Sequence, residues 1–463
     1  MFPKEVYAER RQRLKNIVQS GIVLILGNEE SAMNAVANPY KFRQDSSFLY
    51  FFGLDYPHMV GVMDIDNDED IIFANDVDID DVIWMGPQPS VADLAKEVAV
   101  KKTRPYGDLS SYLKTAIEQG RKIHFLTPYR HEHYLFYQEF LGLHASIVKH
   151  YVSKELIKAV VALRSIKDQY EIDELKKAIE VGYEMHTLAM KMCKPGVVER
   201  EIAGAIEGVA LAHGGMVSFP VILSQHGETL HNHYHGNVLE KGRLMLTDAG
   251  AETDMHYASD FTRTVPVGGV FSPEQKEVYE IVLAANMKAI EMTAPGVYYR
   301  DVHLAACKVL AEGLKDMGLM KGDMDEAVRQ GAHALFMPHG LGHMLGLDVH
   351  DMENLGEDYV GYDDTIERSS QFGLAYLRLA KKLEPGYVLT DEPGIYFIPE
   401  LIDLWKKEHK FSDFINYDKL EAFKTFGGIR IEDDILVTEQ GCEVLGKPVP
   451  KTVSEIETLM QDN

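Results

Sequence analysis

Two aspartates lie at symmetric positions in the segment LMLTDAGAETDMHYASDFTRTVP, which covers residues 244–266. The pattern predicts an apolar strand ending near Asp248, a polar turn centred on Asp254 and a returning strand that carries Asp260. A hairpin folded about Asp254 would make the other two aspartates cross-strand partners, with carboxylates within about 5 Å on one face. Bare carboxylates at that separation repel each other. A shared proton, a basic partner or cations must therefore neutralise them.

Two glutamates have similar surroundings further along the chain. Glu392 lies in VLTDEPGIYF and Glu432 in FGGIRIEDDILV, and an acid is unexpected in such apolar, β-prone runs. The segment FMPHGLGHMLGLDVHD adds the imidazoles of His339, His343 and His350. Four carboxylates and one imidazole indicate a dinuclear metal centre, because two divalent cations cancel four negative charges. The oxygen-rich set favours Mn²⁺, with Zn²⁺, Co²⁺ or Fe²⁺ as alternatives.

Each of these residues also has an ordinary structural explanation. An aspartate at a strand end is commonly a turn former or a cap, and Glu392 precedes a Pro-Gly turn. A histidine beside glycine is commonly a core or surface side chain with a hydrogen-bond partner. Independent accidents would not assemble one coherent set of ligands, so the joint pattern favours the metal centre.

Length and composition indicate a globular protein of two domains. The chain has 463 residues, of which 46% are hydrophobic and 26% charged. A net charge of −25 disfavours nucleic acids and anionic membrane surfaces as partners. Three widely spaced cysteines are present, an odd number without a C-x-x-C arrangement, so we expect no disulfide framework; they are Cys193, Cys307 and Cys442. The amino terminus lacks a signal-peptide core and no apolar run of about 18 residues follows, so we expect a cytoplasmic protein.

The first part of the chain, residues 1–158, predicts an α/β domain without a catalytic constellation. Strands are expected at residues 22–26, 60–65, 71–74 and 123–127, and helices at 7–18, 91–99 and 109–119. A long amphipathic helix from residue 170 to about residue 192 then opens the second domain, residues 159–463.

A short internal repeat appears at an offset of 100 residues. The sequence PGVVEREI begins at Pro195 and PGVYYRDV at Pro295, and each follows one predicted helix and starts another. A structural repeat would give two pseudo-symmetric halves with helices packed outside a shared antiparallel sheet. The candidate ligands would then come from both halves, where rigid strands can hold them.

The segments TDAG, SDFTRT, HGLGH, DVHD, TDEPGIY and GIRIEDD together resemble the proline-specific metallopeptidases of the pita-bread fold, aminopeptidase P and prolidase. The resemblance covers nearly the whole chain, since RQDSSFLYFFGLDYP and VIWMGPQP are similar to the amino-terminal domain of aminopeptidase P. It implies a two-domain α+β protein. A creatinase/aminopeptidase-P-like α/β domain would precede a pseudo-symmetric pita-bread catalytic domain.

The resemblance also implies roles for individual residues. Two metal ions would be bound, with Asp260 and Glu432 bridging both, by Asp248, Asp260, His343, Glu392 and Glu432. Catalytic or substrate-binding roles would fall to His231, His339, His350, Arg378, Arg430, Tyr396 and the ligand Glu392. Glu392 or Glu432 would relay a proton, and His339 or His350 would help to stabilise the oxyanion. Arg378 matches an arginine that binds the dipeptide carboxylate in prolidase-like sequences.

The chain departs from the family's pattern in one place, because the separation between Asp248 and Asp260 is one residue longer. An extra residue in the turn leaves both ligands in place, whereas one inside a strand would rotate a ligand to the wrong face. The symmetry about Asp254 favours the turn.

By resemblance, we expect an Xaa-Pro aminopeptidase, which releases the first residue of small peptides with proline in second position. RQDSSF and the Trp84 segment favour this activity, whereas Arg378 and the spacing from Glu392 to Glu432 favour prolidase. A metal-free pita-bread binding module is disfavoured, because all five ligand types are present. Relatives form dimers or tetramers, in which Trp84 would close a neighbour's pocket; an ordinary core tryptophan is the alternative.

Overall fold

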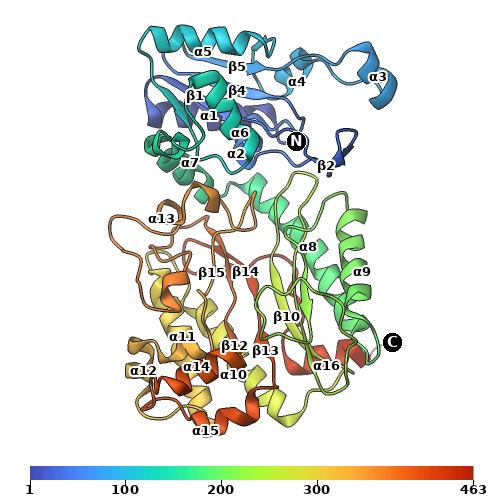
Figure 1. Ribbon diagram of the computed structural model, residues 1–463, viewed down its shortest axis with the longest axis vertical. Coiled ribbons are helices and arrows are strands. Elements are labelled where there is room, and N and C mark those ends of the chain that lie inside the picture. The colour runs from blue at the N-terminus through green and yellow to red at the C-terminus, as the bar shows by residue number, and fades with distance from the viewer. Residues whose placement is uncertain (462–463) are drawn as a thin grey trace. The chain divides into compact units, whose positions relative to one another are not determined.

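The structure is a computed structural model, and it describes residues 1–461. The chain forms two compact units (Figure 1). The amino-terminal unit comprises residues 1–164 and 353–359, and the carboxy-terminal unit comprises residues 165–352 and the chain from residue 360 onward. The domain boundary expected between residues 158 and 159 falls within helix α7, Lys154–Ser165.

The amino-terminal unit is built on one mixed sheet with the strand order β6-β5-β4-β1-β7. These strands are β1 Ile22–Leu26, β4 Val60–Asp64, β5 Glu69–Phe73, β6 Lys102–Arg104 and β7 Ile123–Phe125. The short strands β2 Ala32–Ala35 and β3 Asn38–Pro39 pair separately. The helices are α1 Lys4–Val18, α2 Ser46–Phe52, α3 Ile79–Met85, α4 Val91–Glu97, α5 Asp108–Glu118 and α6 His131–Leu141. Strands and helices together confirm the predicted α/β domain, whose core includes Leu24, Val62, Phe73 and Leu113.

A buried charge cluster lies at the end of β4. Asp64 accepts hydrogen bonds from the Tyr112 hydroxyl at 2.5 Å, from Asn67 Nδ2 at 2.9 Å and from the guanidinium of Arg121. Burial alone would raise the pKa of Asp64, but the hydrogen bonds from Arg121, Tyr112 and Asn67 outweigh it and lower the pKa below 3.8. The folded protein therefore favours the ionised form of this carboxyl.

Two helix pairs of the carboxy-terminal unit confirm the internal repeat. Helix α8, Gln169–Met192, is followed by α9, Glu199–Ala212, and α10, Pro273–Met292, by α11, Tyr299–Asp316. Gly196 and Gly296 join the members of each pair with φ angles of 90° and 81°. Their N–H groups donate to the carbonyls of Leu239 at 2.9 Å and Leu383 at 2.8 Å, so the two corners share one hydrogen-bonding pattern.

Strands from both halves meet inside the carboxy-terminal unit (Figure 1). The first half supplies β8 Ile222–Ser224, β9 Leu244–Ala249 and β10 Phe261–Pro266, in the order β10-β9-β8. The second half supplies β11 Val388–Asp391, β14 Asp433–Val437 and β15 Cys442–Val444 in one sheet, and β12 Gly394–Tyr396 with β13 Gly428–Arg430 in another. A β-bridge between Thr262 and Glu432 connects the halves.

The hairpin of β9 and β10 differs from the predicted register. Asp248 lies opposite Thr262, two residues beyond Asp260, so the expected direct pairing of the two aspartates is wrong. The turn is centred on Met255, between Thr253 and Tyr257, and His256 adopts the left-handed region with φ 67°. Moving the centre by one residue shifts the register by two, and a shift of two keeps side chains on the same face. Both aspartates therefore face the same side.

Shorter elements complete both units. Those of the carboxy-terminal unit are α12 Met324–Gln330, α14 Pro399–Lys407, α15 Tyr417–Leu420, α16 Val453–Gln461 and the 3-10 helices η2 Ala332–Leu335, η4 Leu374–Tyr376 and η5 Glu421–Phe423. The 3-10 helices η1 Val148–His150 and η3 Glu353–Leu355 lie in the amino-terminal unit, and α13 Glu357–Val360 begins there. Within residues 1–461, no helix combines the length and the apolar character needed to cross a bilayer.

Candidate metal centre

The carboxy-terminal unit contains a pocket of about 850 Å³ that brings together most of the residues singled out in the sequence. Its walls include Asp248, Asp260, His343, Glu392, Glu432, His231, His339, His350, Arg378 and Arg430. Tyr396 is fully buried, and its hydroxyl contacts two residues of this wall. Trp84 belongs to α3 of the amino-terminal unit and is 84% exposed, so its reading as a core tryptophan is wrong.

Strand termini position the four acids of the pocket. Asp248 is the penultimate residue of β9 and Asp260 directly precedes β10, whereas Glu392 follows β11 and Glu432 precedes β14. Backbone hydrogen bonds fix the two glutamates, because Glu392 N–H donates to Leu341 at 2.8 Å and Glu432 N–H to Thr262 at 3.0 Å. The acids are thus held by backbone pairing in both pseudo-symmetric halves of the carboxy-terminal unit.

The imidazole of His343 is oriented for metal binding. Its Nδ1 lies 3.0 Å from the carbonyl of Met344, which can only accept, so Nδ1 carries the proton. Nε2 then has a free lone pair, 3.4 Å from Asp260 Oδ2 and 4.0 Å from Glu392 Oε1. Two ligands at bond lengths of about 2.1 Å from one ion stand roughly 3.0–3.4 Å apart. One ligand atom each from His343, Asp260 and Glu432 lies within 4.8 Å of the others.

The pKa values of three acids in this pocket, Asp260, Glu392 and Glu432, are raised in the absence of cations. Burial, followed by the charges of Glu432 and Asp248, raises the pKa of Asp260 well above its usual range. Burial raises the pKa of Glu392 to about 8, against the opposing charge of Arg430. Among the residues that the structure describes, the buried Oδ1 atoms of Asp248 and Asp260 have no hydrogen-bond partner. The two arginines of the pocket, Arg430 and Arg378, cannot neutralise four carboxylates, so this set fits a pair of divalent cations.

A hydrogen-bonded chain connects three more residues of the predicted site. Arg430 pairs with Asp248 through Nη2, and its Nη1 donates to the Tyr396 hydroxyl at 2.8 Å. The Tyr396 hydroxyl in turn lies 2.9 Å from His339 Nε2. His339 Nδ1 donates to Gly340 at 2.7 Å, so Nε2 accepts the tyrosine proton. Burial lowers the pKa of His339 to about 3, so its ring is neutral.

Three positioning residues were missed by the sequence reasoning. The Thr262 hydroxyl donates to Glu432 at 2.6 Å and accepts from Arg430 Nε at 3.0 Å. Thr390 Oγ1 accepts the N–H of His343 at 3.1 Å, and the carboxylate of Asp434 accepts the N–H of Asp260 at 3.1 Å. Thr262 lies two residues after Asp260 in a strand, so the alternation of faces could have indicated it.

The remaining predicted residues also line the pocket. The ring of His350 lies beside that of His343, tilted by 58° at a centroid separation of 4.1 Å, and His231 and Arg378 also line the pocket. Apolar side chains also missed from sequence include Phe219, Phe372, Leu401 and Leu404. The pocket therefore combines charged and apolar side chains, as small-molecule sites commonly do.

Two pseudo-symmetric halves that jointly hold buried carboxylates and a lone-pair-bearing imidazole define a metal-dependent hydrolase of the pita-bread fold. The family model described as metallopeptidase family M24 matches residues 173–439, and that of the aminopeptidase P amino-terminal domain matches residues 7–125. The chain belongs to metallopeptidase family M24.

Relatives of two named activities are similar over the whole chain. The Xaa-Pro dipeptidase of Homo sapiens is 34% identical across 99% of this chain and 94% of that protein. A probable Xaa-Pro aminopeptidase of Aspergillus clavatus is 33% identical across 99% of this chain and 97% of that protein. The solved structure of Pseudomonas aeruginosa aminopeptidase PepP has a TM-score of 0.81 and 30% identity, covering 99% of this chain and 98% of that one.

Proposed function

We propose that the protein is a metal-dependent Xaa-Pro aminopeptidase that removes the first residue from small peptides with proline in second position. The observation that carries this proposal is the convergence of Asp248, Asp260, His343, Glu392 and Glu432 in one pocket. Relatives named Xaa-Pro aminopeptidase and structures named aminopeptidase P support the specificity.

The five converging residues would hold two divalent cations, which we propose to be Mn²⁺ because four of the five ligands are carboxylates. When bound, such ions polarise the scissile carbonyl and lower the pKa of a water molecule. Zinc-substituted Escherichia coli aminopeptidase P has been solved with product, so Zn²⁺ is the alternative to test.

The side chains of this pocket would divide the remaining work. Glu392 is the most accessible of three acids, with 19% of its side chain exposed against 6% for Asp260 and 12% for Asp248. That access suits Glu392 to accept a proton from the attacking water and deliver it to the departing proline nitrogen. His350 would contact the substrate carbonyl. Both ring nitrogens of His339 are engaged by Gly340 and Tyr396, so His339 would act by holding Tyr396 in place.

A substrate with proline in second position cannot meet one requirement that many other peptidases impose. A proline imide has no N–H, so a site that depends on an extended, hydrogen-bonding substrate backbone excludes it. The apolar walls of this pocket offer the proline ring contacts that need no such hydrogen bond. Phe372, Tyr376 and Leu404 are 37%, 56% and 49% exposed at its edge, which leaves room for residues beyond proline.

Prolidase activity on Xaa-Pro dipeptides is the second candidate, and Arg378 favours it. A guanidinium in the pocket wall can pair with the carboxylate that ends a dipeptide. The human relative named Xaa-Pro dipeptidase is also 34% identical to this chain.

Peptide length separates the two candidates. We expect Mn²⁺-loaded protein to cleave Ala-Pro-Ala at least as well as Ala-Pro, measured by release of alanine. Efficient cleavage of Ala-Pro without turnover of Ala-Pro-Ala would make prolidase the first candidate and Xaa-Pro aminopeptidase the second. Replacing Arg378 by Met should raise KM for Ala-Pro far more than for Ala-Pro-Ala if Arg378 binds the dipeptide carboxylate.

We further propose that the protein acts in the cytoplasm as a homodimer or homotetramer, with neither nucleic acid nor membrane as a partner. The net charge of −25 supports the last point, and the 84% exposure of Trp84 supports contact with a second copy. Light scattering would measure the mass in solution. A monomer at micromolar concentration, unchanged by Trp84→Ala, would contradict the oligomer.

A further inference from the structure

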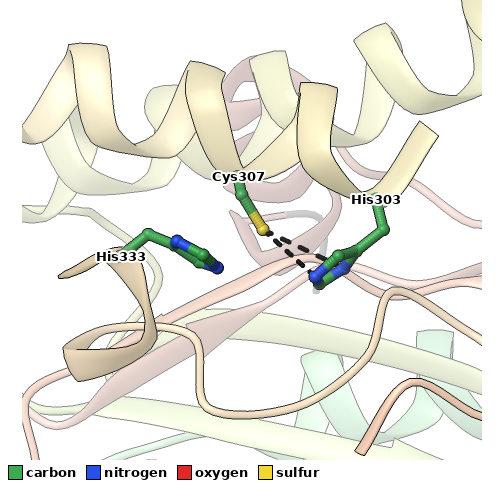
Figure 2. A group of neighbouring side chains, drawn as sticks. All are labelled: His303, Cys307 and His333. Atoms are coloured by element: carbon green, nitrogen blue, oxygen red, sulfur yellow. Dashed lines mark hydrogen bonds between the residues drawn. The ribbon is translucent and has the colours of Figure 1, made fainter. Parts of the chain in front are cut away.

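A second cluster of side chains that can bind a metal lies in the carboxy-terminal unit, on elements that do not carry the four acids and His343 of the pocket. His303 and Cys307 are four residues apart on α11 and therefore share one face of the helix. His333 comes from the 3-10 helix η2, which begins after the left-handed Gly331. Figure 2 shows the three side chains pointing toward one another from these two elements.

The distances within the cluster are those of groups that can share an ion. One ligand atom from each of the three side chains lies within 4.8 Å of the other two. Cys307 Sγ is 3.5 Å from Nε2 and 3.9 Å from Nδ1 of His303. The rings of His303 and His333 are inclined by 67° at a centroid separation of 6.3 Å, so they are not stacked.

Burial makes this cluster unusual. His303 and Cys307 are completely buried, and His333 is 3% exposed. In the described part of the chain, neither ring nitrogen of His333 has a hydrogen-bond partner. A neutral imidazole carries one N–H donor and one acceptor, and burying both without partners is unfavourable. A thiol–imidazole hydrogen bond would account for Cys307 and His303 but leaves His333 unexplained.

We propose that His303, Cys307 and His333 form a second metal site, which binds a thiophilic d¹⁰ cation, Zn²⁺ or Cu⁺. One thiolate and two imidazoles are ligands that both ions accept, and hard ions such as Mn²⁺ and Mg²⁺ prefer oxygen. The ion would use the lone pair of His333 that lacks a partner. With Cu⁺ the thiolate makes the site neutral, whereas with Zn²⁺ it retains one positive charge.

The protonation states of the free side chains are compatible with this site. Burial lowers the pKa of His303 to about 3 and that of His333 to about 4, so both imidazoles are neutral and can donate a lone pair. Burial raises the pKa of the Cys307 thiol, so the ion must displace its proton. Binding would therefore release one proton and strengthen as the pH rises.

The position of this second site gives it a structural role. An ion there would join α11 to η2, and the chain that leaves η2 carries His339 and His343 of the pocket. The carbonyl of Phe336, directly after η2, accepts a hydrogen bond from Tyr396 N–H at 2.9 Å. The bound ion would thus hold η2 in place, at the start of the segment that carries His339 and His343.

Sulfur provides a probe that separates the two metal sites, because the ligands of the pocket are all oxygen and nitrogen. X-ray absorption of the protein loaded with Zn²⁺, and separately with Cu⁺, should show a metal–sulfur distance, about 2.3 Å for zinc. The sulfur signal should persist in Cys193→Ala and Cys442→Ala, and in Asp260→Ala, in which the pocket is impaired. It should disappear in Cys307→Ala and in Cys307→Ser.

A stability measurement tests the same site independently of spectroscopy. Added Zn²⁺ or Cu⁺ should raise the Tm of Asp260→Ala, in which the pocket is impaired, and the increase should be lost when Cys307→Ala or His333→Phe is combined with Asp260→Ala. The absence of metal–sulfur scattering for both ions would overturn the proposal. Scattering that survives in both Cys307 variants would also overturn it, by assigning the sulfur to another cysteine.

Discussion

At the scale of single residues, the hydroxyl of Thr262 shows how the pocket controls opposite charges. It donates to Glu432 at 2.6 Å and accepts from Arg430 at 3.0 Å, so one small group orients an acid and a base. The Arg430 guanidinium also donates hydrogen bonds to Asp248 and to the Tyr396 hydroxyl. Loss of the hydroxyl would leave Glu432 and Arg430 without a fixed relative position.

The first prediction concerns this hydroxyl. Thr262→Val keeps the shape of the side chain, and we expect kcat/KM to fall roughly 10–100-fold because the orientation of Glu432 is lost. Thr262→Ser retains the hydroxyl and should stay within a few-fold of wild type. Steady-state kinetics and Mn²⁺ titration measure both effects. Equal activity of the valine and serine variants would remove Thr262 from the positioning role.

The second prediction concerns Glu392, the acid proposed to move the proton. Glu392→Gln should lower kcat by roughly 10²–10⁴ while the fold is retained, because glutamine cannot accept the proton. Glu400 also lines the pocket but is exposed, so Glu400→Gln is the matched control and should be close to wild type. Steady-state kinetics measures kcat, and circular dichroism checks the fold. A Glu392→Gln variant that is folded and fully active would exclude this role for Glu392.

At the scale of elements, the sequence predicted the hairpin strands and their common face but placed their register two residues away. The register depended on His256, whose positive φ moves the turn centre to Met255, and a non-glycine residue gives little local signal for that conformation. The two helix pairs were predictable, because their Pro-Gly corners repeat visibly in the sequence. The second cluster was not, since only packing brings His333 of η2 beside α11.

A third prediction follows from the close approach of the two hairpin strands. A Cβ at Gly250 would lie 1.8 Å from the Ser259 carbonyl oxygen, so the backbone must separate. We expect Gly250→Ala to destabilise the protein by about 1–3 kcal/mol and to weaken metal binding, since Asp260 adjoins Ser259. Denaturant unfolding and metal titration measure the two effects.

The control for that substitution is another glycine in the same unit. Gly204 lies exposed in α9 with open space around its Cβ position. Gly204→Ala should stabilise the protein by about 0.5–1 kcal/mol through the lower entropy of the unfolded chain, and should leave metal binding unchanged. A destabilisation common to both variants would point to a general intolerance rather than to the hairpin.

At the scale of the whole molecule, the two-unit division was broadly predictable, whereas one of its details was not. Residues 353–359 belong to the amino-terminal unit although they follow the histidine-rich segment. The local hydrophobic periodicity of the sequence contains no information about which unit such a short segment joins. The family's motifs, in contrast, indicated the pita-bread fold because they span both halves of the repeat.

The amino-terminal unit should contribute its own pH dependence through Asp64. A carboxyl whose folded pKa is lowered adds stability that is complete above its unfolded value of 3.8 and is lost as the pH falls through the folded value. Asp64→Asn should therefore cost roughly 2–3 kcal/mol near neutrality, and the difference from wild type should shrink below pH 3.8. Unfolding curves of both proteins across this range provide the measurement. A difference that does not change with pH would contradict the assignment.

The five proposed ligands are divided between two stretches of polypeptide, with Asp248 and Asp260 on one and His343, Glu392 and Glu432 on the other. If they hold the ions as proposed, neither stretch can coordinate the ions by itself. A protein cleaved in the loop between β10 and α10 should be inert as separate fragments and regain turnover only when they recombine. Turnover by this enzyme thus reports that translation and folding of both stretches have been completed.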